Sequence, residues 1–515
     1  MSAVAPEIGA PPRDRSRPIL LLTALILTIA ISLAVGIGAA HEPVLAIAGV
    51  LALLGMAVVA IRPEAAVLIV VGLIYSNAPV VLVQFHSVPL AIGASVPIIL
   101  AAPLAYDILI RRHKIVLTPA MPWIAGLLVV QILSTLTARD PSDAASSLGT
   151  FFVEGIGLYL LVTNTIRSPE LMRAVIWVLL LVGAALGALS FFQEITETYG
   201  TSYFGFAQTE AAATGVTETG IARLAGPIGE KNRYAQIMLM LIPLAVMQFS
   251  GERRRWLRVA ALGCALLAAI ATALTFSRGA ALAAGIILVA MVALRYVRVS
   301  HLLAAAALIA VVLIAVPAYG TRLASLADLG ALLSDEPASA QTDNSLLSRA
   351  TENLTALRVF ADHPILGVGP GQFPAYYRDY ADEIGVSVRA ADRQAHNLYL
   401  GLAAETGILG LTMFLAAVAA TLVQLARART RALSRRPELA AMAAGFMLAI
   451  VGYLASGLFL HLSYARYFWL ILALGGAAAT VILQATADDA ATAGDYGDDA
   501  VADVVAAPVP GAATP

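Results

Sequence analysis

Long apolar segments alternate with polar connections along most of the chain. Each segment is long enough to cross the roughly 30 Å hydrocarbon core of a bilayer as a helix that rises 1.5 Å per residue. The pattern predicts an all-α polytopic membrane protein with roughly 12–14 transmembrane helices. The expected segments are 19–39, 44–61, 65–83, 88–110, 120–137, 147–166, 172–193, 233–250, 259–276, 279–294, 302–318, 397–425, 440–460 and 467–484.

Positive charge lies mostly on one set of connections between these segments. With a cytoplasmic N-terminus, the short exterior connections hold Arg139, Arg278 and Arg466. This asymmetry follows the positive-inside rule and predicts a multi-pass bacterial inner-membrane protein whose working surface faces the periplasm or exterior. The basic residues expected in the cytoplasm are Arg13, Arg15, Arg17, Arg62, Arg111, Arg112, Lys114, Arg167, Arg173, Arg253, Arg254, Arg255, Arg258, Arg295, Arg298, Arg427, Arg429, Arg431, Arg435 and Arg436.

Two exterior connections, at about 194–232 and 319–395, are too long to be simple links, and loops of that size are usually functional. The larger one contains apolar residues at helical spacing, which predicts an amphipathic helix lying on the membrane or on the bundle. These residues are Leu346, Leu347, Ala350, Leu354, Leu357 and Ala361.

The chain therefore divides into five parts. We expect a cytoplasmic arm at 1–18, a transmembrane bundle at 19–318, a large periplasmic or exterior loop at 319–395 and C-terminal transmembrane helices at 396–484. Residues 485–515 are rich in Asp, Ala, Pro and Gly, and they predict a disordered acidic cytoplasmic tail.

Composition excludes a water-soluble protein. The chain is 60% hydrophobic and 13% charged, with a mean hydropathy of +0.84, whereas soluble domains have about 45–50% apolar and about 25% charged residues. Its one cysteine, Cys264, lies in an apolar segment, so an internal disulfide framework is excluded.

Three polar side chains stand at the exterior edge of the predicted helices. They are Arg223 in RLAGPIGEKNRYA, Arg278 in TFSRGAA and His396 in RQAHNLYLGLAAETGILGL. Each has an ordinary structural interpretation: a solvated loop charge for Arg223, a helix-end residue reaching the interface for Arg278, and a helix-start residue bonded to the backbone for His396.

Together these three side chains indicate a site for a phosphorylated lipid. Guanidinium groups bind phosphate oxygens bidentately, and a neutral imidazole can accept a proton at neutral pH. Such groups suit attack by a hydroxyl on the anomeric carbon of a lipid-pyrophosphate-linked sugar. The arginines would neutralise the leaving pyrophosphate, and the imidazole would activate the acceptor.

Other polar motifs favour structural roles. Asp379, Asp382 and Glu383 lack the spacing of a recognised ion loop, so we expect a solvated acidic face and no metal. The sequence GVGPG at 367–371 matches no nucleotide-binding fingerprint and predicts a tight turn. On one straight helix Glu405 would face away from His396, which favours a supporting ion-pair or hydrogen-bond role.

At these residues the chain resembles the superfamily of O-antigen ligases and Wzy-type O-antigen polymerases. The matching pieces are RLAGPIGEKNRYA, LTFSRGA, ADHPILGVGPGQF and AHNLYLGLAAETGILGL. The resemblance implies a GT-C-like membrane glycosyltransferase that uses an undecaprenyl-pyrophosphate-linked glycan without a metal or cofactor. It also implies that His396 is the acceptor-activating base, supported by Asn397 and Glu405, and that Arg223 and Arg278 bind pyrophosphate.

The expected partners are the lipid-linked oligosaccharide donor, membrane lipids and a glycan, lipid or protein hydroxyl acceptor, with no nucleic acid. The choice among ligase, polymerase and protein glycosylation stays open. A polysaccharide flippase or transporter is the alternative from another class, although it predicts internal repeats and a site near the bilayer midplane.

Overall fold

The structure is a computed structural model that describes residues 64–89, 112–210, 222–300, 344–384, 393–462 and 465–505, together with a few isolated positions before residue 112. Helices dominate this part of the chain. Seven of them are long and apolar enough to cross a membrane, or up to eight if the bent pair α3–α4 forms one span. The expected all-α polytopic membrane protein is confirmed.

The helices follow the predicted apolar segments closely. Segments 19–39, 44–61, 88–110 and 302–318 lie mainly outside the described residues. Segment 65–83 corresponds to the bent pair α3–α4, and each of the others coincides with a helix or a continuous helical run. The bundle consists of α3 (Ala65–Tyr75), α4 (Ala78–His86), α7 (Met121–Thr135), α8 (Pro141–Thr150), the π-helix η2 (Phe151–Gly157), α9 (Leu158–Thr165), α10 (Pro169–Ile195), α12 (Lys231–Gly251), α13 (Arg255–Leu274), α14 (Arg278–Ala293), α20 (Leu398–Ala432), α21 (Pro437–Ser456) and α22 (Ala465–Val505).

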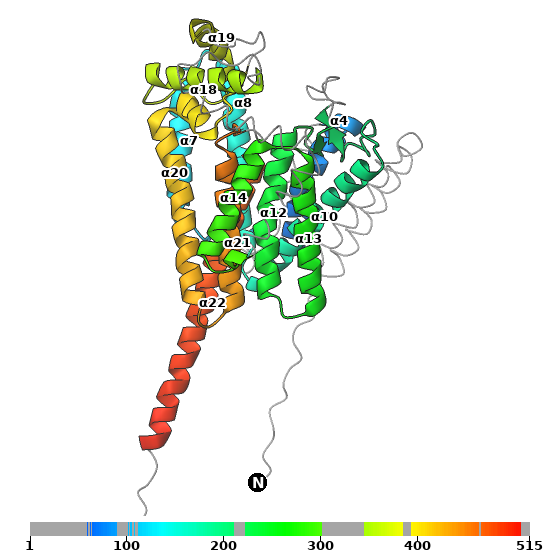
Figure 1. The fold of residues 1–515 in the computed structure, drawn as a ribbon. Helices are drawn as coiled ribbons and strands as arrows, with labels where there is room; N and C mark the ends of the chain where they lie inside the picture. The colour runs from blue at the N-terminus through cyan, green and yellow to red at the C-terminus, as the bar shows by residue number, and fades with distance from the viewer. Residues whose placement is uncertain are drawn as a thin grey trace, which may run out of the picture.

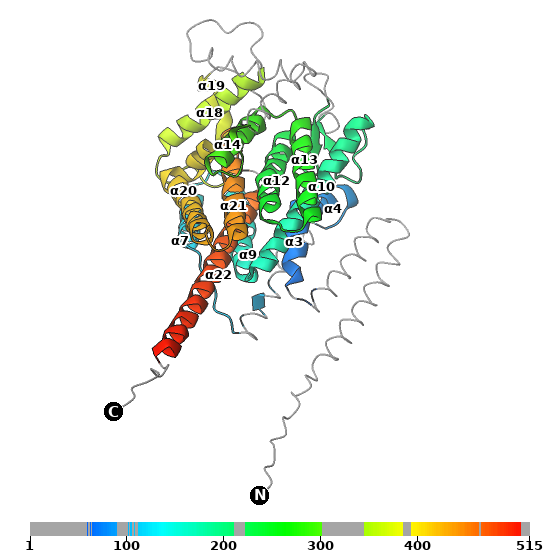
Figure 2. The same ribbon diagram turned by 60° about the horizontal axis from the view of Figure 1, so that its bottom comes forward.

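Close packing around α12 and α21 forms the middle of the bundle. α12 packs against α13 and α21, and α20 packs against α7 and α22 (Figures 1 and 2). Glycines permit this approach: a Cβ built on Gly452 would lie 2.5 Å from Ile287, and one on Gly445 would lie 3.3 Å from Leu244. Small residues are favoured at membrane helix contacts because van der Waals packing drives the association there.

The helices α18 (Asn344–Asp362) and α19 (Phe373–Ile384) lie at the same end of the bundle as α4 and α8, at the top of Figure 1. A short antiparallel pair, β1 (Gln208–Thr209) and β2 (Leu224–Gly226), comes from the other long connection. His86 Nε2, at the end of α4, lies 3.1 Å from the carbonyl oxygen of Phe204 in that connection. Both long connections therefore meet one end of the bundle.

The structure confirms a helix in the larger connection and shows which face of it packs against the protein. The buried residues of α18 include Thr351, Glu352 and Thr355, whereas Leu354 and Leu357 are 46% and 49% exposed. The helix thus turns a largely polar face toward the protein and leaves part of its predicted apolar stripe outside. The reason is a tertiary contact: the buried face supplies partners for polar side chains near the start of α20.

Residues 485–505 belong to α22 in the structure, whereas the sequence predicts a disordered tail from residue 485. α22 continues as a helix to Val505, in a segment rich in alanine, which has the highest helix propensity. Arg436 also donates two hydrogen bonds of 2.7 Å to the Asp489 carboxylate, a strong bidentate pair that holds this part of α22 beside the start of α21.

Candidate active site

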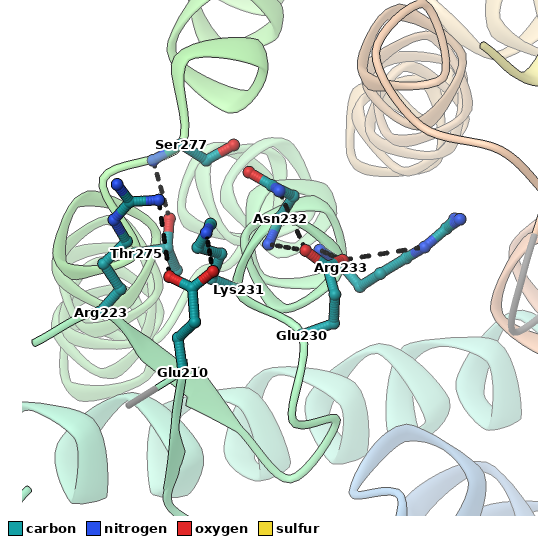
Figure 3. Close-up of polar contacts among 8 residues, drawn as sticks. All are labelled: Glu210, Arg223, Glu230, Lys231, Asn232, Arg233, Thr275 and Ser277. Atoms are coloured by element: carbon teal, nitrogen blue, oxygen red, sulfur yellow. Dashed lines mark hydrogen bonds and ion pairs between the residues drawn. The ribbon is translucent and has the colours of Figure 1, made fainter. Parts of the chain in front are cut away.

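Arg223 is buried, which argues against an ordinary solvated loop charge. It precedes β2, is 5% exposed, and its Nη1 lies 3.5 Å from Oε2 of Glu210. Lys231, the first residue of α12, forms an ion pair with the other oxygen of the same carboxylate. We call Glu210, Arg223 and Lys231 the cationic cluster, because its two cations share one anion (Figure 3).

The turn between the paired strands and α12 explains the glycines of RLAGPIGEK. Gly226 and Gly229 have φ of +53° and +77°, and a Cβ on Gly226 would lie 2.5 Å from the Tyr234 ring. Glycine adopts this left-handed backbone without steric cost. Glu230 then caps α12 by accepting bonds from the amides of Asn232 and Arg233 at 3.0 and 2.8 Å.

Arg278 begins α14 directly after a sharp turn. Thr275 ends α13, Phe276 has φ of +53°, and Ser277 caps α14 by accepting a bond from the Ala280 amide at 3.4 Å. A left-handed aromatic residue is uncommon and costs energy, so the surrounding structure enforces this tight reversal. The turn places Thr275 and Ser277 beside Arg223 (Figure 3).

A pocket opens beside the starts of α12 and α14. It is small, with a volume of about 10 Å³, roughly the space of one water molecule, and part of it opens to solvent. The partial positive charge of two helix N-termini and the Arg349 side chain favour an anion there. Its lining residues are Asn232, Ser277, Gly279, Ala280, Arg349, Ser456, Phe459 and Leu460.

His396 lies in a second polar group near the start of α20. Its Nδ1 is 2.5 Å from Oε2 of Glu352, and Arg393 donates a bond of 2.9 Å from Nε to Oε1 of the same carboxylate. The His461 ring centroid is 5.8 Å from that of His396. We call Glu352, Arg393, His396 and His461 the histidine cluster.

The pKa directions in the histidine cluster follow from burial and charge. Burial raises the pKa of Glu352, but contacts with His396 and Arg393 outweigh it, so the pKa lies below its ordinary value and the group is ionised at neutral pH. Burial, together with the positive charges of Arg233 and Arg393 and the neighbouring His396, holds the pKa of His461 well below its ordinary value. His461 is therefore neutral at pH 7.

Asn397 fixes the start of α20 beside the loop after α21. Its side chain accepts bonds from the amides of Tyr399 and Leu400 at 2.9 and 3.1 Å and donates a 3.3 Å bond to the Leu458 carbonyl. The Leu398 amide also donates a 2.7 Å bond to the Gly457 carbonyl. Since Phe459 and Leu460 line the pocket, the 457–461 loop connects the pocket with the histidine cluster.

Glu405 contacts the glycine-rich turn and not His396 in any described interaction. Its Oε1 accepts a 3.4 Å bond from the Phe373 amide. α20 is broken at Gly407, which has φ of +64°. A Cβ built on Gly407 would lie 2.1 Å from the Ile365 carbonyl oxygen. His396 itself precedes the helix, so one straight helix carrying both side chains is not what the structure has.

The turn at 364–373 supplies backbone partners to the broken part of α20. The amides of Val368 and Gly369 donate to the carbonyls of Ala404 and Glu405 at 3.0 and 2.9 Å, and the Ile408 amide donates to the Pro364 carbonyl at 2.8 Å. The GVGPG sequence therefore forms a tight turn whose function is structural: it closes the hydrogen bonds that the helix break leaves open.

The acidic residues of α19 form no metal site with the described residues around them. Asp379 accepts a 2.6 Å bond from Arg139, whose guanidinium lies 3.6 Å from the centre of the Tyr376 ring. Among the parts of the chain that the structure describes, no group of three or more His, Cys, Asp or Glu side chains is placed to hold a metal ion.

The site contains residues that the sequence argument missed. Arg233, in the first turn of α12, is 3% exposed and interacts with Tyr453 and His461; in Figure 3 it extends away from the Glu210 carboxylate. A charge inside a membrane helix is a functional signal in itself, so its sequence position was informative. Glu352 gave no such signal, because acidic residues are common in polar helices.

The helical bundle defines a polytopic membrane protein, and its polar end holds the candidate site. Residues 263–415 match the family model described as O-Antigen ligase, which confirms the resemblance to this superfamily. The match supports glycan transfer of the ligase or polymerase type in polysaccharide biosynthesis. It includes Arg278, Glu352 and His396, whereas Arg223, Arg233 and His461 lie outside it. No curated protein matches the chain.

Proposed function

We propose that this protein is a membrane glycosyltransferase that transfers or polymerises glycan from an undecaprenyl-pyrophosphate-linked donor on the periplasmic face of the inner membrane. One observation carries the proposal. The cationic cluster and the histidine cluster lie at one end of the bundle, and the pocket is lined by Asn232 of α12, which follows Lys231 in the chain, and by Phe459 and Leu460, which precede His461. An anion-binding region thus adjoins a neutral imidazole.

The donor pyrophosphate binds between the starts of α12 and α14 in this proposal. Arg278 and Arg223 approach it with bidentate guanidinium groups, and the two helix N-termini add partial positive charge. Glu210, which is itself paired with Lys231, holds Arg223 in place before the donor arrives. Because arginines neutralise the leaving group, the reaction as proposed needs neither a metal nor a cofactor.

His396 acts as the base in the transfer step. The acceptor hydroxyl gives its proton to the imidazole while its oxygen forms a bond to the anomeric carbon of the donor sugar. The bond from that carbon to the phosphate oxygen breaks, and lipid pyrophosphate leaves with the electron pair. General-base assistance of this kind contributes typically about 10²–10⁴-fold to a rate.

The periplasmic location rests on charge distribution. Basic residues such as Arg253, Arg254 and Arg435 belong to the connections opposite the site, which is the arrangement of cytoplasmic loops. Undecaprenyl-linked glycan must therefore already be on the outer face when it reaches this protein.

The test is transfer in vitro by purified protein in detergent or vesicles. We expect release of lipid pyrophosphate and glycan transfer when a lipid-pyrophosphate-linked donor and a hydroxyl acceptor are supplied together. A protein that moves the donor across vesicle membranes without transferring sugar would instead be a transporter. That result would reject the proposed function.

Deleting the gene distinguishes the acceptor classes. Loss of chain length in the surface glycan, analysed on gels, identifies a polymerase, and loss of attachment of full-length glycan identifies a ligase. Accumulation of precursor on the cytoplasmic face contradicts both.

A further inference from the structure

Glu352 is buried in a helix that lies outside the transmembrane bundle. Its side chain has an exposure of 0%, and both oxygens are engaged: Oε1 by Arg393 and Oε2 by Nδ1 of His396. It reaches His396 across 44 residues of sequence, because the chain returns from α18 through α19 to the start of α20. No sequence motif indicates a role for Glu352.

The contact determines which nitrogen of His396 carries the proton. An ionised carboxylate donates no hydrogen bond, so at a separation of 2.5 Å from Oε2 the nitrogen that carries a hydrogen is Nδ1. The lone pair of the neutral ring is then at Nε2. A histidine in this state presents a proton acceptor on the side away from Glu352.

The buried face of α18 fits this interpretation better than a purely covering role. A helix that only shielded the site would bury Leu354 and Leu357, yet these side chains are 46% and 49% exposed. It buries Thr351, Glu352 and Thr355 together with Ala356 and Val359. Burying a carboxylate is costly, and the cost is offset when the group has charged partners.

We propose that Glu352 is a positioning residue that holds His396 with Nδ1 protonated and Nε2 directed to the acceptor hydroxyl. This inference rests on the proposed function. When Nε2 takes the acceptor proton, the imidazolium that forms is stabilised by the adjacent carboxylate, while the acceptor oxygen bonds to the anomeric carbon and lipid pyrophosphate departs. The imidazolium then releases the proton to water, and Glu352 stays ionised throughout.

Arg393 completes the arrangement. Its bond to Oε1 leaves Oε2 for His396 and fixes the plane of the carboxylate. It also keeps Glu352 ionised, since a nearby cation favours the charged form of a carboxyl group.

A double-mutant cycle tests the proposal with full-length protein and a lipid-pyrophosphate-linked donor. Glu352→Gln should lower kcat by about 10-fold or more, and less than His396→Ala does, with donor KM within about 2-fold of wild type, as expected for a group acting on the base. In the His396→Ala background, Glu352→Gln should cost nothing further, because the carboxylate acts only through the imidazole. Glu383→Gln, the same change at an exposed acid of α19, is the control.

The pH dependence of kcat on the acid side is a second measurement. It should change if Glu352 acts on His396 and stay the same if Glu352 has only a structural role. Loss of the carboxylate should shift it to lower pH, because the charged imidazole loses its partner. If Glu352→Gln is poorly folded, Glu352→Asp is the second variant, because it keeps the negative charge. Its kcat should lie between those of Glu352→Gln and the wild type when equal amounts of monodisperse protein are compared. If Glu352→Gln keeps kcat within 2-fold, or the two losses add independently, Glu352 is structural and this proposal is wrong. If His396→Ala itself retains transfer, the base assignment of the proposed function has failed instead.

Discussion

The cationic cluster and the histidine cluster both pair a glutamate with basic side chains, but they differ in net charge and in the chemistry that they suit. In the cationic cluster, Arg223 and Lys231 share Glu210, so positive charge remains in excess at every physiological pH. In the histidine cluster, Glu352 contacts one permanent cation and one imidazole, and His461 is held neutral nearby. The first arrangement suits binding of an anion, and the second suits movement of a proton.

This difference predicts how substitutions divide between binding and rate. Changes to the cationic cluster should act mainly on donor KM, because the charge is needed before and during the reaction. Changes to the histidine cluster should act mainly on kcat, because the base is needed only as the acceptor bond forms.

The largest expected effect concerns the side of the membrane on which both clusters lie. A cysteine replacing exposed Glu383 in α19 should react with an impermeant thiol reagent in intact spheroplasts, and one replacing Ser434 should not. The native Cys264 is buried, so its background labelling should be low. Labelling at Ser434 without lysis would place the two clusters on the cytoplasmic side and reject the exterior site.

His396→Ala should have the next largest effect, about 10²–10⁴-fold in kcat, with donor binding largely retained. His396→Gln should not restore transfer, because an amide forms hydrogen bonds but does not take up the proton. The measurement is transfer by purified variants at saturating donor. His363→Ala removes another imidazole from the same exterior segment and is the control. If His396→Ala transfers glycan at a rate within a few-fold of wild type, His396 is not the base, and His461 is the next candidate.

Arg223→Ala should raise donor KM by about 10–100-fold, the value of a lost charged hydrogen bond, and change kcat less. Arg278→Lys should lose most activity although the charge is kept, because an ammonium group does not form the bidentate contact. Arg254→Ala is the control, because it removes one positive charge at the end of the bundle opposite the site. A wild-type KM in the Arg223→Ala, Arg278→Lys double variant would contradict pyrophosphate binding by these arginines and would leave both with structural roles only.

The smallest effect is a pH dependence of stability from His461. The unfolded chain protonates this imidazole below about pH 6.5, whereas the folded protein, with its lowered pKa, keeps it neutral. Stability should therefore decrease as the pH falls from 7.5 to 5.5, by at most about 1.4 kcal/mol per pH unit for one group. Thermal unfolding in detergent at several pH values measures it. His461→Gln should flatten the curve, and an unchanged slope would contradict the assignment.

The apolar pattern and the local motifs were sufficient to predict the described membrane helices and three residues of the candidate site. Periodicity and length located the described membrane helices, and the RLAGPIGEKNRYA, TFSRGA and AHNLYLG motifs led to Arg223, Arg278 and His396. These properties depend on residues close together in sequence. Helix caps such as Ser277 and Asn397, and left-handed glycines such as Gly226, act within a few residues.

The tertiary structure alone decided which face of α18 is buried and what the site contains. The sequence of α18 has an apolar stripe at Leu354 and Leu357 and a polar one at Thr351 and Thr355, and periodicity does not say which faces the bundle. That depends on Arg393 and His396, which lie far along the chain and return beside Glu352 only in the folded protein. The free energy of placing a buried carboxylate beside its charged partners is a property of that long-range contact, so no local pattern records it.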